Sequence, residues 1–92
     1  MSAGPMTVRS SGKEHTFDID LAWPVGITAK AACKHLDISL NDHLQPCFMT
    51  EYFDKYSVKH TKPLDPGQNF RSQGVRSNHI LVLTIKITGG GF

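Results

Sequence analysis

The chain has 92 residues, of which 39% are hydrophobic and 20% charged, and its formal net charge is +2. This length suits one small domain with a single core and leaves little room for a deep catalytic cavity. The ten Lys and Arg residues are dispersed along the chain, which argues against a nucleic-acid-binding surface. No apolar run reaches the ~18 residues of a membrane-spanning helix, so we expect no transmembrane segment. We also expect a monomer.

The two cysteines, Cys33 and Cys47, indicate the compartment. Two are too few for a disulfide framework, and they lie outside any metal-ligand spacing. Both have apolar neighbours, where free cysteine behaves as a small hydrophobic residue. The N-terminus lacks the pattern of a signal peptide, and residues 1–5 read as a flexible lead. We therefore expect an intracellular protein, cytoplasmic or nuclear.

The first structured segment is predicted to be a β-hairpin. Residues 6–9 begin a strand, and a turn containing Gly12 follows, since glycine readily adopts positive φ. Residues 15–21 then alternate strictly, with Phe17, Ile19 and Leu21 on one face. Strand, short glycine turn and strand are typical of a hairpin.

A short helix is expected next. Pro24 and Gly26 interrupt the alternation, and the hydroxyl of Thr28 can cap a helix. One apolar stripe follows at i, i+3, i+4 and i+7, formed by Ala29, Ala32, Cys33 and Leu36. The helix is predicted to run for about nine residues and to end near Asp37, and it needs the sheet for stability because it is so short.

The middle of the chain is less regular. Residues 44–50 predict a third strand, in which Pro46 requires a non-donating position at an edge or bulge. Residues 51–61 are polar and aromatic, with one short strand expected over 57–59. Residues 64–67 form a turn, and residues 69–72 suit a one-turn helix that carries Phe70 inward.

The last strand alternates clearly. Leu81, Leu83 and Ile85 share one face, and the other face carries Ile80, Val82 and Thr84. The expected fold is therefore an α+β roll, with a mixed four- to five-stranded sheet packed on one helix. The domain is predicted over residues 6–88, with a glycine-rich tail at 89–92.

The order of features from residue 64 to residue 90 resembles the C-terminal half of ubiquitin. The matching residues are Leu64, the turn glycine Gly67, the inward Phe70 and Val75, the strand leucines Leu81 and Leu83, and the terminal pair Gly89 and Gly90. The resemblance to the ubiquitin-like β-grasp family extends over residues 6–90. There are departures, since the segment 51–61 is longer than ubiquitin's turn and Gln73 stands where ubiquitin has a tyrosine.

The resemblance implies a partner-binding surface on the sheet face. The positions of ubiquitin's recognition patch read here as Ser10 or Ser11, Phe48, Val82 and Thr84, so that the patch is half kept. The predicted partner-binding residues are Arg9, Phe48, Ile80, Val82, Thr84 and Lys86. An exposed apolar patch of this kind often marks a binding site. The alternative is that the aromatic segment 51–61 covers it.

The glycine tail permits two readings. In the family, a terminal Gly89-Gly90 pair implies conjugation to other proteins after removal of Gly91 and Phe92. Glycine-rich tails are also common as flexible linkers to a further domain.

Catalytic chemistry is not indicated. The five histidines, which are His15, His35, His43, His60 and His79, form no paired metal spacing, and no nucleophile, phosphate-binding or zinc-protease motif is present. Cys33 and His35 are an i, i+2 pair on different faces of the helix, and Cys47 has no adjacent base. We therefore expect no enzyme activity, no cofactor and no metal.

Three functions remain. The first is a non-catalytic interaction domain, part of a larger protein of the ubiquitin pathway, that binds a protein partner through the sheet face. The second is a free ubiquitin-like modifier conjugated through Gly90. The third is a ubiquitin-like lobe of the FERM type that contacts a membrane or a small GTPase, which Lys55, Lys59 and Lys62 in the long aromatic segment favour.

Overall fold

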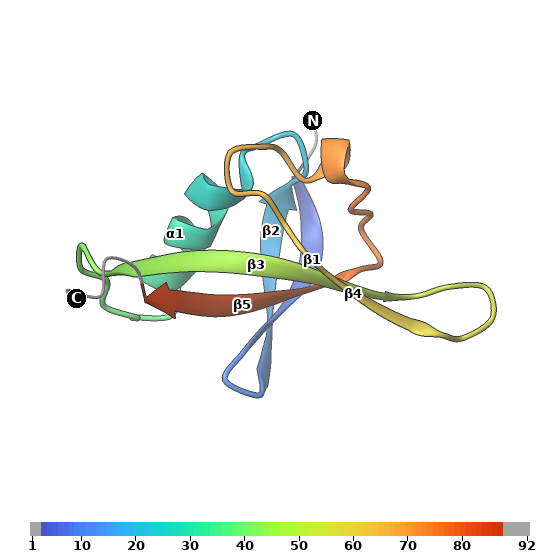
Figure 1. The fold of residues 1–92 in the computed structure, drawn as a ribbon, viewed down its shortest axis with the longest axis horizontal. Helices are drawn as coiled ribbons and strands as arrows, with labels where there is room; N and C mark the ends of the chain where they lie inside the picture. The colour runs from blue at the N-terminus through green and yellow to red at the C-terminus, as the bar shows by residue number, and fades with distance from the viewer. Residues whose placement is uncertain (1–2, 88–92) are drawn as a thin grey trace.

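The computed structural model describes residues 3–87. Within these residues, five strands form one sheet in the order β2-β1-β5-β3-β4, and a single α-helix packs against it (Figure 1). The elements are β1 (Ala3–Ser10), β2 (Lys13–Asp20), α1 (Val25–His35), β3 (Leu44–Phe53), β4 (Lys59–Pro63), the 3₁₀ helix η1 (Arg71–Gln73) and β5 (Ile80–Ile87). The mixed sheet on one helix confirms the predicted α+β roll.

The N-terminal hairpin starts earlier than predicted. β1 begins at Ala3 and pairs with β2 from Ala3↔Asp20 to Ser10↔Lys13. Residues 3–5 of the expected flexible lead are therefore strand residues. The two-residue turn has positive φ at both Ser11 and Gly12, as the type I′ turn that matches the twist of a hairpin requires.

The last strand lies in the centre of the sheet. β5 pairs in parallel with β1 through Thr7↔Ile80 to Arg9↔Val82, and antiparallel with β3 through Leu44↔Ile87 to Glu51↔Ile80. The strand nearest the C-terminus thus joins the first hairpin to the β3–β4 pair.

Helix α1 also begins earlier than predicted. It starts at Val25, and the Thr28 hydroxyl donates to the carbonyl of Pro24 at 3.0 Å and does not cap the N-terminus. The backbone N–H groups of Val25 and Gly26 donate to the carbonyls of Gln68 and Pro66 at 2.9 and 3.0 Å. This distant loop satisfies donors that otherwise need a side-chain cap. The helix ends at His35, and the predicted stripe is confirmed, with Ala29, Ala32 and Cys33 buried and Leu36 packed against the core.

The core lies between α1 and one face of the sheet. Phe48 and Phe70 meet there with ring centroids 5.9 Å apart, so that Phe70 points inward as predicted.

The strand expected over 57–59 is wrong in position, because β4 runs over Lys59–Pro63. β4 pairs with β3 only from Met49 onward, which leaves Pro46 where β3 has no neighbour on that side. That position confirms the expected edge site.

Candidate interaction surfaces

The predicted patch needs one correction. Phe48 is only 1% exposed and belongs to the core, so it cannot contact a partner. Its neighbour Met49 faces the opposite side of the sheet and lies directly across from Val82. Because successive strand side chains alternate between faces, a shift of one residue moves the contact from the core to the surface.

The outward face of the central strands forms a continuous surface, which we call the β3–β5 surface. Cross-strand pairs Met49↔Val82 and Cys47↔Thr84 make its centre, and Gln45↔Lys86 makes one end. Met49, Val82, Thr84 and Cys47 are all partly exposed. The predicted residues Val82, Thr84 and Lys86 are therefore brought together, while α1 and the core lie behind the sheet.

The opposite end of this surface carries an ion-pair cluster. Arg9 is on β1, directly beside Val82 of β5. Its guanidinium bonds to Glu51 on β3, so that the Arg9 side chain reaches across β5. Lys59 Nζ lies 3.4 Å from the same carboxylate. Ile80, which is paired with Glu51 and Thr7, sits at this end of the face and is only partly exposed.

The cluster perturbs both charged groups. The hydrogen bond from Arg9 lowers the pKa of Glu51, and Lys59 adds to this, against the opposing effect of burial. The same hydrogen bond raises the pKa of Arg9. Both groups therefore stay charged near neutral pH, and the Arg9 position is held by a salt link to a nearly buried carboxylate.

The aromatic segment does not cover the β3–β5 surface. Residues 59–63 form β4, which extends the sheet in its own plane beside β3. Tyr52 stacks between two histidines instead, with its ring centroid 5.0 Å from His60 and 4.5 Å from His79. The alternative that residues 51–61 shield the patch is therefore wrong.

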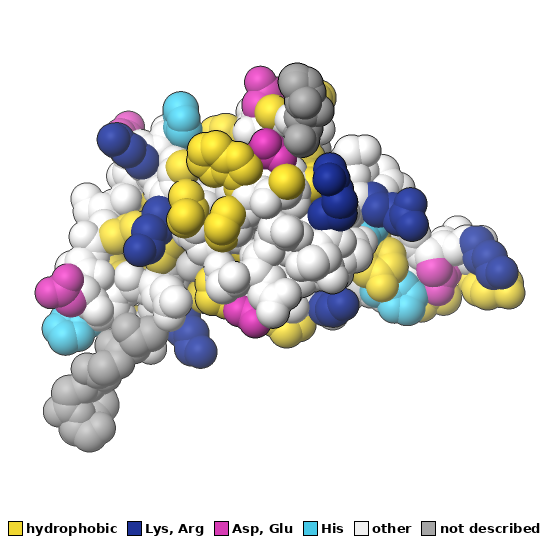
Figure 2. All heavy atoms as spheres, turned by 90° about the horizontal axis from the view of Figure 1, so that it is seen from above, with side chains coloured by type: hydrophobic (Ala, Val, Ile, Leu, Met, Phe, Trp, Pro, Cys, Tyr) yellow, Lys and Arg dark blue, Asp and Glu magenta, His cyan; other side chains and the backbone are white. Residues whose placement is uncertain are grey.

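A second surface lies at the other edge of the sheet. β2 is an edge strand, and two adjoining hollows of about 350 and 270 Å³ separate it from α1. Phe17, Ile19 and Ala31 line this β2–α1 groove, and the exposed Trp23 and Ile27 stand at one end. Figure 2 shows a group of hydrophobic side chains on the face it views, with carboxylates and Lys or Arg side chains around them.

The described residues offer little for catalysis. No three His, Cys, Asp or Glu side chains within residues 3–87 are placed to hold a metal ion. Both cysteines are free, and burial raises the pKa of the Cys33 thiol, which makes it a poor nucleophile. His79 is buried, at 7% exposed, although its polar neighbours in the sequence would suggest a surface position. Within the same residues no helix is long and apolar enough to cross a membrane.

Comparison with solved structures supports the architecture. A chain from the structure described as "Molecular Mimicry of SUMO promotes DNA repair" superposes with a TM-score of 0.63 over 91% of this chain and 92% of that one, at 16% identity. The fold is the ubiquitin-like β-grasp. No family model and no curated protein matches the chain. At this identity the likeness extends to the fold, which confirms the resemblance seen in the sequence.

Two residues of the β3–β5 surface, Met49 and Glu51, and the glycine tail need comment against the sequence predictions. Met49 and Glu51 were missed, and only the register across β5, which places them beside Val82 and Ile80, identifies them. Gly89 and Gly90 lie outside the described residues, so conjugation through Gly90 stays a prediction.

Proposed function

We propose that the chain is a non-catalytic ubiquitin-like interaction domain that binds a protein partner through the β3–β5 surface. The observation that carries the proposal is the pair Met49↔Val82, two apolar side chains that face solvent while the core lies behind them. The β-grasp is used for many functions, so the argument rests on this surface and not on the fold.

The surface has the composition of a binding site. Interfaces commonly have an apolar centre with a polar rim, and Met and Arg are enriched in them. Met49 supplies an adaptable apolar contact. Arg9 is held in place by Glu51, so less side-chain entropy is lost when it binds. The solved neighbour comes from a structure described in terms of molecular mimicry of SUMO, and one protein mimics another through its surface, which agrees with a binding role.

The test is loss of partners on charge insertion. Met49→Arg and Val82→Arg place a charge at the centre of the surface, and Lys34→Glu on the exposed face of α1 is the matched control. Partners captured in the native cell extract are quantified for each bait, after thermal unfolding shows that all the baits fold. The proposal expects one set of partners to be lost from both surface variants and kept by the control. If both variants retain every partner, it is wrong.

The β2–α1 groove supports a second candidate contact. An unpaired edge strand beside an apolar hollow is the arrangement that accepts an extended peptide as an added strand. Asp18 and Asp20 border the hollow, which favours a peptide carrying Lys or Arg beside its apolar residues. Replacement of Ala31 by Arg would reduce such binding, because a bulky cation fills the hollow and repels a basic peptide, and would leave contacts at Met49 intact. This difference separates the two surfaces.

A further inference from the structure

The β3–β4 hairpin extends beyond the rest of the sheet. The pairing of β3 with β5 ends at Glu51↔Ile80, whereas its pairing with β4 continues to Phe53↔Lys59. Figure 1 shows the hairpin reaching away from the body of the molecule. We call residues 53–59 the hairpin tip.

The hairpin tip exposes three large apolar side chains. Phe53 is 63% exposed, Tyr56 73% and Val58 52%. Three such residues within six positions are a costly arrangement in water, and they contribute nothing to the core. Figure 2 shows hydrophobic and basic side chains together at this end of the molecule.

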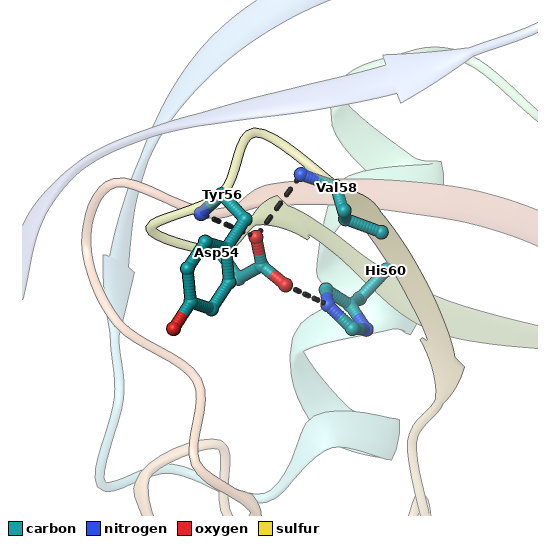
Figure 3. A network of polar contacts seen from close by, with 4 residues as sticks. All are labelled: Asp54, Tyr56, Val58 and His60. Carbon is teal, nitrogen blue, oxygen red and sulfur yellow. Dashed lines mark hydrogen bonds and ion pairs between the residues drawn. The ribbon is translucent and has the colours of Figure 1, made fainter.

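The hairpin tip is held in one conformation by Asp54. Its Oδ1 accepts hydrogen bonds from the backbone N–H of Tyr56 and Val58 at 2.8 and 3.0 Å, and its Oδ2 lies 2.8 Å from His60 Nε2 (Figure 3). The Asp54 N–H donates to the Val58 carbonyl, and Ser57 N–H donates to the Asp54 carbonyl, each at 3.0 Å. The apolar side chains are therefore displayed on an ordered turn, which lowers the entropy cost of binding.

The charges around the hairpin tip favour an anionic partner. The two nearby carboxylates are engaged internally, Asp54 by the turn and Glu51 by Arg9 and Lys59. Lys55 stands beside the tip with its Nζ 5.2 Å from the centre of the Tyr56 ring, whereas Lys59 is paired with Glu51. Lys62 donates to the carbonyl of Gln73 and does not join this group.

We propose that the hairpin tip inserts Phe53, Tyr56 and Val58 into the interface of an anionic lipid bilayer, with Lys55 contacting the lipid phosphates. Aromatic residues favour the interfacial region of a bilayer, and basic residues add attraction to anionic lipid. A stable protein interface buries roughly 800 Å² of surface on each partner, which is more than three apolar side chains on a protruding tip can supply. A fluid bilayer accepts such a shape without a complementary pocket.

Vesicle sedimentation of the full chain tests the proposal. The probes are vesicles of phosphatidylcholine alone and of phosphatidylcholine with phosphatidylserine. The protein is expected to sediment with the anionic vesicles, less so at high salt, and far less with the neutral ones. The double variant Phe53→Ser, Tyr56→Ser is expected to weaken binding by at least about tenfold, because both side chains lose their burial in lipid. Lys55→Glu is expected to weaken binding to the anionic vesicles alone.

The matched control removes equally exposed apolar residues elsewhere. Trp23 and Ile87 are 56% and 74% exposed and lie outside the hairpin, so Trp23→Ser with Ile87→Ser is expected to leave sedimentation unchanged. Absence of sedimentation by the unaltered chain, equal binding to neutral vesicles, or an equal loss in the control would each overturn the proposal. A change of oligomeric state in the tip variant without vesicles would also overturn it, in favour of self-association.

Fluorescence locates the inserted residue. Trp23 is the only tryptophan, so Phe53→Trp in a Trp23→Phe background reports on the hairpin tip alone. Its emission is expected to shift to shorter wavelength on addition of anionic vesicles, while the original Trp23 emission stays constant. The opposite pattern would show that another surface meets the lipid. These variants leave Met49 and Val82 intact, so failure here does not bear on the proposed protein contact.

Discussion

At the scale of single residues, Glu51 controls how the β3–β5 surface responds to acid. Its pKa is lowered in the folded chain, chiefly by Arg9, so the unfolded chain binds more protons at low pH. The resulting stability is fully present above the ordinary carboxyl pKa near 4.5 and is lost as pH falls through the lowered value.

Arg9→Ala should therefore flatten the acid side of the stability profile. Without Arg9 the pKa of Glu51 returns toward its ordinary value, and less stability is lost on acidification. Urea unfolding between neutral pH and pH 3 measures this, with Lys34→Ala as a control that removes an exposed cation on α1. An acid slope equal to that of the unaltered chain would show that Arg9 does not hold Glu51 in solution.

His79 gives a second pH dependence. Its Nδ1 lies 3.1 Å from the Thr50 hydroxyl and 3.4 Å from the backbone N–H of Arg76, and its ring stacks on Tyr52. Burial, aided by the charge of Arg76, lowers its pKa below the ordinary 6.5. Protonation would place a hydrogen on Nδ1 facing the Arg76 N–H, which can only donate.

The stability due to neutral His79 is present above pH 6.5 and lost as pH falls through the lowered pKa. His79→Gln should remove this part of the profile, and the exposed His43 provides the control in His43→Gln. NMR titration of the His79 ring checks the direction directly. A midpoint above 6.5 would contradict the buried, neutral state.

Residue-level prediction from the sequence succeeded where alternation was clean. Val82 and Thr84 were assigned to the correct face because Leu81 and Leu83 point inward on either side of Val82. β3 gave no such signal, because Cys47, Phe48 and Met49 are consecutive apolar residues. Which of them faces solvent depends on the register with β5, and that is a long-range property.

At the scale of elements, the loop between β4 and β5 depends on Phe70. This side chain is fully buried against Phe48, just before η1 begins. It therefore also holds in place the preceding residues 66 and 68, whose carbonyls accept hydrogen bonds from the N-terminus of α1. Phe70→Ala is expected to cost about 3–5 kcal/mol, through lost burial and a cavity. Phe53→Ala, at a 63% exposed position, should stay within about 0.5 kcal/mol. Chemical unfolding compares the two, and similar losses would refute the packing assigned to Phe70.

Element boundaries were harder to predict for physical reasons. α1 begins at Val25 because carbonyls of residues 66 and 68, far along the chain, receive its first N–H groups. β4 has no apolar alternation in Lys59–Pro63, since most of its side chains are exposed, and so its position depends on pairing with β3.

At the scale of the whole molecule, the central position of β5 makes folding depend on the last strand. The first hairpin and the β3–β4 pair meet only through β5 within the sheet. A chain that ends at Arg76 should therefore lose cooperative unfolding, whereas one that ends at Ile87 keeps every described element and should unfold as the full chain does. Circular dichroism during heating separates them. A cooperative transition in the shorter chain would contradict the topology.

Site-specific photocrosslinking in the native cell shows whether a partner binds at the β3–β5 surface. A photoreactive amino acid is placed at Thr84 on that surface, at Ala31 in the β2–α1 groove, and at Asp42 in an exposed loop as a control. We predict a discrete adduct from position 84, lost on Val82→Arg, and none from position 42. Adducts from position 31 with none from position 84 would contradict the account and assign the partner to the groove.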